Sequence, residues 1–112
     1  MPDNKILSML GLARRAGKLS MGHDMAEQAV LKKRAKMIFF CCDVSPRLVN
    51  EFKKTMELHG IDIPLFQTEI TIEQIHFFVG YKAGVLTVDD ENFSKRIISL
   101  LKQEEYANGN KG

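Results

Sequence analysis

Apolar side chains near the start of the chain repeat every three or four residues, which is the spacing of one face of a helix. They are Ile6, Met9, Leu10, Ala13 and Ala16. Gly17 is expected to end this helix, and residues 19–21 are a short strand candidate that Gly22 closes. Asp24 and Glu27 then resemble a capping box, so a second helix is predicted to begin at Asp24.

Residues 37–42 are apolar at every position. This run is typical of a strand that is covered on both faces. It includes Cys41 and Cys42, which we expect to be small, buried and reduced hydrophobic residues of a cytosolic protein. Two cysteines alone are too few for the usual four-ligand metal site.

The second half of the chain carries clear signals for helix ends. Ser45 followed by Pro46 predicts the start of a helix, and Gly60 predicts its end. Thr71 and Gln74 form a second capping-box pattern, which opens a further short helix.

Two more strands and a last helix complete the pattern. Residues 61–66 are predicted to form the third strand. Because this segment contains Pro64, either the strand lies at the edge of the sheet or Pro64 lies at the strand end. Residues 84–88 are the fourth strand candidate, and either Asp89 or Asp90 is expected to cap the final helix.

Helices and strands therefore alternate along the whole chain. This alternation indicates an α/β fold in which helix layers cover both faces of a small mixed sheet. With 112 residues the chain fits one domain, predicted over residues 1–107. Residues 108–112 are polar, contain glycine and are expected to form a disordered tail.

The charge of the chain is unevenly distributed. Residues 1–36 hold eight Lys and Arg against three acids, a net charge of +5, so a total of +2 leaves −3 for the remainder. Such asymmetry suggests a polyanionic partner, although a solvated basic face explains it equally well. Arg14, Arg15 and Lys18 interrupt the first apolar run, so neither a signal peptide nor a membrane span is expected, and the protein is predicted to be cytoplasmic.

The sequence carries no motif of a common enzyme class. Gly17-Lys18 resembles the end of an NTPase phosphate loop, but Leu12 and Leu19 stand where that loop needs Gly and Ser or Thr. The three histidines and the carboxylates form no recognisable catalytic motif. No enzymatic activity is therefore predicted, and a small α/β enzyme is only the third hypothesis.

Residues 10–22, LGLARRAGKLSMG, closely resemble the opening of the bacterial YlxQ-type proteins. These belong to the kink-turn-binding ribosomal protein superfamily, the L-seven-Ae and L-thirty-e group. The likeness covers residues 6–101 and continues through residues 35–40, Asp43, VGYKAGVLTV at 79–88 and FSKRI at 93–97. It implies a three-layer α/β/α sandwich around a four-stranded mixed sheet, with RNA binding and with neither catalysis nor a cofactor.

The resemblance implies RNA contacts in two parts of the chain. The first is the turn into the second helix, where the family carries G-x-N-E-x-x-K and this chain has residues 22–28. Gly22 matches that pattern, whereas Asp24, Met25 and Gln28 replace Asn, Glu and Lys. The second part is the loop between the fourth helix and the last strand, residues 80–84.

The three replacements alter the chemistry of base reading. Ionised Asp24 only accepts hydrogen bonds and repels phosphates, whereas Asn also donates. Met25 lacks the acceptor that Glu offers to guanine, and Gln28 lacks the charge of Lys. Each bidentate base contact is worth about 1–3 kcal/mol, so these changes weaken standard kink-turn recognition. Asp24 also has a simpler interpretation as an N-cap whose carboxylate accepts helix N–H groups.

The predicted RNA-binding residues combine both parts with nearby cations. They are Arg15, Lys18, Gly22, His23, Asp24, Met25, Gln28, Lys32, Tyr81, Lys82 and Gly84. His23 either stacks on a base or is an exposed spectator, and Tyr81 either offers a stacking ring or packs in the core. Gly22 allows close approach of RNA or merely a tight turn.

The expected partner is structured RNA, with ribosomal RNA or the ribosome as the candidate, and neither a membrane nor a small-molecule substrate is expected. The alternative is a protein-interaction module on the same fold that has little specific affinity for RNA.

Overall fold

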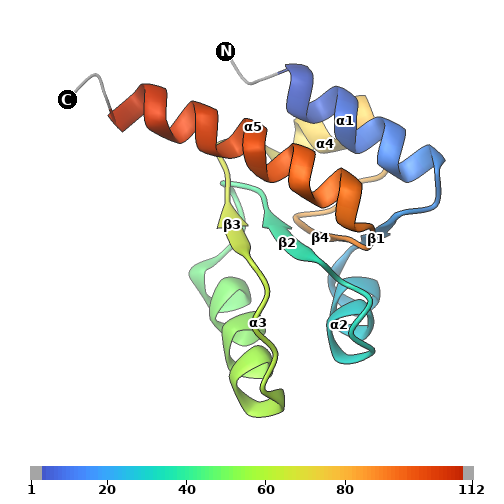
Figure 1. Ribbon diagram of the computed structural model, residues 1–112, viewed down its shortest axis with the longest axis vertical. Coiled ribbons are helices and arrows are strands. Elements are labelled where there is room, and N and C mark those ends of the chain that lie inside the picture. Colours follow the sequence, from blue (N-terminus) through green and yellow to red (C-terminus); the bar gives the residue numbers. More distant parts are fainter. Residues whose placement is uncertain (1–3, 110–112) are drawn as a thin grey trace.

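The computed structural model describes residues 4–109, and the side chains of residues 5–103 within them. In this part of the chain five helices alternate with four strands (Figure 1). The elements are α1 (Asn4–Arg15), β1 (Leu19–Met21), α2 (His23–Leu31), β2 (Met37–Phe40), α3 (Pro46–His59), β3 (Leu65–Gln67), α4 (Ile72–Val79), β4 (Val85–Val88) and α5 (Glu91–Gly109). Of the predicted disordered tail, residues 108–109 belong to α5 instead, and residues 110–112 lie outside the described residues.

The four strands form one mixed sheet in the order β1-β4-β2-β3. Strand β4 is antiparallel to both of its neighbours, and β2 pairs in parallel with β3. Leu86 of β4 stands opposite Met21 of β1 and opposite Phe39 of β2. The last strand of the sequence therefore occupies an inner position of the sheet.

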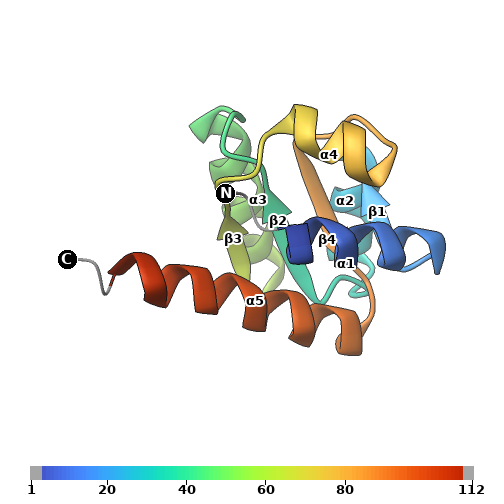
Figure 2. The ribbon, with the colours of Figure 1, turned by 90° about the horizontal axis from the view of Figure 1, so that it is seen from above.

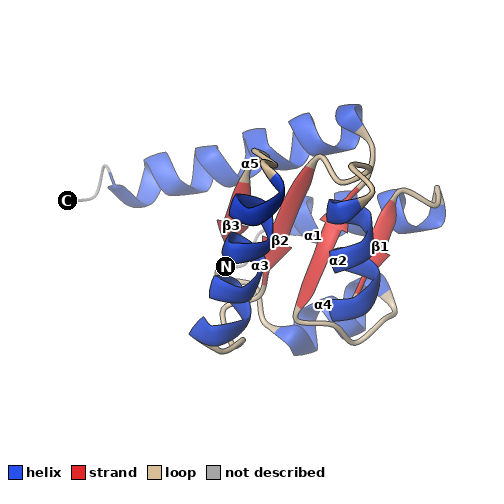
Figure 3. Ribbon diagram, turned by 90° about the horizontal axis from the view of Figure 1, so that it is seen from below, coloured by secondary structure: helices blue, strands red, loops and turns tan. Residues whose placement is uncertain are grey.

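Helix layers cover both faces of this sheet (Figure 3). Because side chains alternate along a strand, Met37 and Phe39 of β2 point to one face while Ile38 and Phe40 point to the other. The first face packs against α1, α4 and α5, and the second packs against α2 and α3 (Figure 2). The predicted three-layer α/β/α sandwich with a four-stranded mixed sheet is confirmed.

Three helix starts follow their local sequence signals. Ser45 Oγ accepts the N–H of Leu48 at 3.3 Å, with Pro46 in the first helical position of α3. Thr71 and Gln74 form the predicted capping box of α4. Asp90 caps α5, because its Oδ2 accepts the N–H of Phe93 at 2.9 Å. The choice left open between Asp89 and Asp90 is thereby settled for Asp90.

Three predicted features differ from the structure. Strand β2 ends at Phe40, and Cys42 is exposed rather than buried, because the chain turns away from the sheet once Cys41 has paired with Gly84. Strand β3 spans only Leu65–Gln67, although it is the predicted edge strand next to Pro64.

Among the described residues, no helix is both long and apolar enough to cross a bilayer.

Candidate nucleic-acid interface

The two predicted contact regions meet at one end of the sheet. Strand β1 runs antiparallel to β4, so the residue after β1 lies beside the first residue of β4. There the Gly22 N–H donates a hydrogen bond to the Val85 carbonyl oxygen at 2.9 Å. The start of α2 and the loop between α4 and β4 consequently lie at the same end of the strands (Figure 3). Arg14, residues 22–28 and residues 80–84 are called the turn–loop surface below.

Cys41 holds the far side of residues 80–84 in place. Its N–H donates to the Gly84 carbonyl oxygen at 2.9 Å, and its Sγ donates to the Ala83 carbonyl oxygen at 3.6 Å. Burial raises the pKa of the Cys41 thiol to about 12, so the thiol stays protonated and unreactive near neutral pH. Tyr81 and Lys82 come just before these two anchored residues and are exposed, which agrees with the exposed interpretation of Tyr81.

Arg14 anchors the near side of the same loop. Its Nη1 donates to the Val79 carbonyl oxygen at 3.1 Å, at the end of α4, and its guanidinium lies 5.7 Å from the centroid of the Tyr81 ring. Arg14 was not among the predicted RNA-binding residues. Its position along α1 is the sequence feature that could have identified it. Leu7, Gly11 and Arg14 are spaced four and three residues apart, so they lie on the same side of α1, the side that meets α4. Its neighbour Arg15 is exposed at the last residue of α1.

Helix α2 begins one residue earlier than predicted, and Asp24 is not its N-cap. Gly22 is the N-cap, with φ 90° and ψ 168°, and its carbonyl oxygen accepts the N–H of Ala26 at 2.9 Å. These backbone angles are almost restricted to glycine, so Gly22 fixes the start of the helix without a side-chain cap. Asp24 instead lies in the first turn with its side chain exposed.

The Asp24 carboxylate interacts with His23 rather than with the helix backbone. The His23 Nδ1 and the Asp24 Oδ1 are 3.1 Å apart, and this hydrogen bond is the main reason why the pKa of His23 is raised above 6.5. The His23 ring also packs edge-on against Phe52 of α3, with centroids 5.7 Å apart. His23 is therefore a held side chain, still 44% exposed, and not a free spectator. Met25 and Gln28 are both exposed on α2.

Two of the predicted residues lie at the opposite end of the sheet. The Lys18 carbonyl oxygen accepts the N–H of Asp89 beyond β4, and the Lys36 N–H donates to Val88 at the end of β4. Lys32 follows the last residue of α2. Because α2 is about 14 Å long, Lys32 lies about that distance from the start of the helix at Gly22. The structure therefore groups Lys32 with Lys36, away from the turn–loop surface, whereas the Lys18 N–H also donates to the Ala13 carbonyl oxygen at 2.8 Å, beside Arg14.

Gly84 has a packing role that the sequence did not reveal. A Cβ atom at this position would lie 2.5 Å from Val44 Cγ1 and 3.3 Å from Ile72 Cδ1. Such distances leave no room for a side chain, so the close approach at Gly84 is made by the protein's own core.

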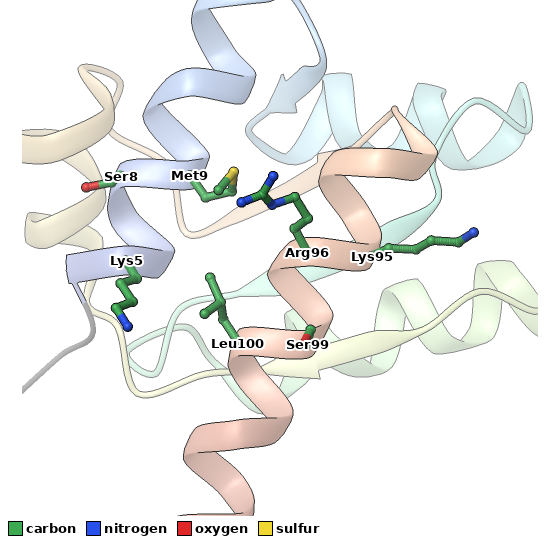
Figure 4. A pocket seen from close by; sticks show the side chains of 7 residues that line it. All are labelled: Lys5, Ser8, Met9, Lys95, Arg96, Ser99 and Leu100. Carbon is green, nitrogen blue, oxygen red and sulfur yellow. The ribbon is translucent and has the colours of Figure 1, made fainter.

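A separate open hollow of about 600 Å³ lies between α1 and α5 (Figure 4). Arg96 reaches across it toward Met9, whereas Lys95 points away from α1. The described residues that line it include three cations but neither a histidine nor a carboxylate. The hollow thus lacks the convergent His and carboxylate pair that would have supported the enzyme hypothesis. No group of His, Cys, Asp and Glu among the described residues is arranged to hold a metal ion.

Comparisons with known proteins agree with this architecture. The chain is 27% identical over 100 residues to the RNA-binding protein YlxQ of Enterococcus faecium. The aligned region covers 88% of this chain and 92% of the relative. A protein of unknown function from Bacillus halodurans has the same fold, with a TM-score of 0.78, 23% identity, and coverage of 89% of this chain and 99% of the other.

The Giardia lamblia 15.5kD RNA binding protein also shares the fold, with a TM-score of 0.68, 14% identity, and coverage of 89% of this chain and 87% of the other. No protein-family model matches the chain. The sequence is thus similar to a YlxQ protein over most of both chains, and this confirms the resemblance that residues 10–22 indicated.

Proposed function

We propose that this chain is a non-catalytic, cytoplasmic RNA-binding protein that contacts RNA through its turn–loop surface, within one domain over residues 1–107. The observation that carries the proposal is the hydrogen bond from the Gly22 N–H to the Val85 carbonyl oxygen. It joins two segments, far apart in sequence, that the family resemblance had assigned to RNA contacts. A relative that matches most of the chain is itself named an RNA-binding protein.

The turn–loop surface offers three kinds of contact that suit RNA. The start of α2 presents backbone N–H groups, which favour phosphate because of the helix dipole. Arg14 and Lys82 add positive charges beside it, and the exposed Tyr81 ring offers a face for stacking on a base. Gly22 adds no side chain at the turn itself, and this leaves room for a phosphate.

The same surface is poorly equipped for reading base edges in the family manner. Asp24 is exposed and ionised, Met25 has no hydrogen-bonding group, and Gln28 has no charge. We infer that phosphate and shape contacts supply most of the affinity, and that the RNA is structured, with ribosomal RNA as the candidate. Specificity for a kink-turn is accordingly expected to be small.

Binding to a standard kink-turn and to a scrambled duplex, measured side by side over a salt series, tests the proposal. We expect similar affinities for both RNAs and a steep loss of affinity with salt. Lys82→Ala should weaken both complexes, whereas Lys32→Ala is the matched control at the opposite end of the sheet and should change them little. Failure to bind either RNA, or equal losses in the two variants, would reject this surface as the site.

A protein-interaction module is the second candidate function. Its support is the start of α2, where exposed Met25 stands beside the ionised Asp24, a combination less suited to phosphate than to a protein. Recovery of a stoichiometric protein partner, together with no RNA above background in the same pull-down, would favour this alternative.

A further inference from the structure

Helix α4 exposes two adjacent phenylalanines that the turn–loop surface does not include. Phe77 is 79% exposed and Phe78 is 47% exposed, although most phenylalanines of a folded protein are largely buried. Their ring centroids are 4.9 Å apart and the rings are nearly perpendicular, at 82°. This edge-to-face arrangement is favourable for an aromatic pair, so the two rings form a defined surface.

The aromatic pair is continuous with the anchored end of α4. Val79 follows directly and accepts the hydrogen bond from Arg14, and the exposed Tyr81 ring lies under the same guanidinium. Helix α1 crosses α4 at this place, because a Cβ on Gly11 would lie 3.5 Å from the Phe78 carbonyl oxygen. Three exposed rings therefore lie within residues 77–81, at the end of α4 that Arg14 contacts.

The charges around the pair favour an anionic partner at its loop end. Arg14, Arg15 and Lys82 are exposed there, whereas the acid of α4, Glu73, lies one turn before Phe77 in the first turn of the helix. A partner that runs along α4 therefore meets rings first and cations next. Bases joined by a phosphate backbone have this combination of flat apolar faces and negative charge.

The pair is too small to serve as the interface of a stable dimer. From the side-chain areas typical of aromatic residues, its exposed surface is roughly 250 Å². A stable protein interface needs about 800 Å² from each partner. Stacking on a few bases requires much less surface, because each base contributes its own contact.

We propose that Phe77 and Phe78 stack on unpaired bases of the bound RNA, so that α4 holds a single-stranded segment next to the structured part. This inference rests on the proposed RNA-binding function and names the class of nucleotide that this part of the chain recognises. Stacking on the two rings requires no base-specific hydrogen bond, so any RNA sequence with unpaired bases is expected to bind.

The test compares two RNAs, a blunt hairpin and an oligoadenylate that contains 2-aminopurine, whose fluorescence reports stacking. Wild-type protein should bind both and should change the fluorescence of the oligoadenylate. Phe77→Ala combined with Phe78→Ala should lower the affinity for the oligoadenylate roughly tenfold while leaving hairpin binding unchanged. Phe77→Tyr, which keeps a stacking ring, should retain the affinity. Leu58→Ala is the matched control, since Leu58 is 82% exposed on α3.

Hairpin binding separates the two hypotheses and also verifies that each variant is folded. If the wild type binds neither RNA, the proposed function fails and this inference fails with it. If the wild type binds the hairpin and the double variant binds the oligoadenylate as well as the wild type does, only the stacking inference is overturned. A wild-type dimer that the double variant converts to monomers would also overturn it, because the pair would then be covered by a second copy.

Discussion

The guanidinium of Arg14 lies over the ring of Tyr81, 5.7 Å from its centroid, while the same group donates to the Val79 carbonyl oxygen. One side chain of α1 therefore holds both the end of α4 and the ring that follows it. A planar guanidinium can make both contacts at once, whereas an ammonium is a point charge.

Replacing Arg14 with lysine should consequently weaken RNA binding even though the charge is kept. We expect Arg14→Lys to lower affinity about fivefold with an unchanged salt slope, and Arg14→Ala to lower it further and reduce the slope by about one. Titrations at several salt concentrations measure both quantities. Arg34→Lys, at the opposite end of the sheet, is the control and should bind as the wild type does. Equal behaviour of the Arg14 and Arg34 variants would contradict the role of Arg14.

Replacing Gly22 with alanine should lower the stability of the protein, because the backbone angles at this position favour glycine and not because a side chain would be crowded. A Cβ there would meet no atom within 4 Å, so the expected cost of Gly22→Ala is backbone strain of about 1–3 kcal/mol. Urea denaturation gives this value. Gly11→Ala provides the contrast, because alanine favours a helix interior by about 0.8–1.0 kcal/mol and its Cβ would make only ordinary contacts. A Gly22→Ala variant as stable as the wild type would show that the turn readily adopts another conformation.

His23 should make RNA binding dependent on pH. Its pKa is raised mainly by the hydrogen bond to Asp24, so its charge is present below the raised pKa and is lost as the pH increases through that value. The stability that the protonated His23 gains from Asp24 has the same pH dependence. It is fully present below the unfolded-state pKa near 6.5 and is lost as the pH increases through the raised pKa. RNA affinity should therefore increase as the pH falls through the raised pKa.

An NMR titration of the His23 ring measures this pKa directly. In Asp24→Asn the pKa should decrease toward its ordinary value, since the carboxylate is gone. The same variant should bind RNA several-fold more tightly at high pH, because one negative charge has been removed from the start of α2. An unchanged His23 titration in Asp24→Asn would show that other groups set this pKa.

The two adjacent cysteines should react at very different rates. Cys42 is exposed, whereas Cys41 is buried and has a pKa raised to about 12 by that burial. A thiol reagent should therefore label one equivalent in the native protein and a second only after denaturation, and mass spectrometry of the peptides should place the first label on Cys42. Rapid native labelling of Cys41 would mean that the anchor of residues 80–84 opens readily.

Most element positions could be predicted because their signals are local. Ser45 and Thr71 cap their helices through their own side chains, so three or four residues of sequence contain the whole interaction. The predicted cap of α2, Asp24, lies two residues after the true cap, Gly22, because Gly22 acts through backbone angles while Asp24 and Glu27 imitate a capping box. A cap without a side chain leaves little trace in a sequence.

The candidate site was less predictable, because its parts meet only through the tertiary fold. Arg14 joins the candidate site because it contacts the end of α4, and β1 separates Lys18 from Gly22 although the two are close in sequence. Phe77 and Phe78 belong to an apolar run in which Ile75 and Val79 are the buried members. Only the packing of α1 against α4 decides which apolar residues of that run remain outside.

Strand β4 lies between β1 and β2 although it is the last strand to be synthesised. During translation the Gly22 N–H cannot reach its acceptor until Val85 has left the ribosome, and β1 has no strand to pair with before then. A nascent chain that ends before Val88 thus carries the basic N-terminal residues without the surface that organises them. The turn–loop surface therefore depends on residues from both ends of the chain and cannot be complete before β4 pairs with β1.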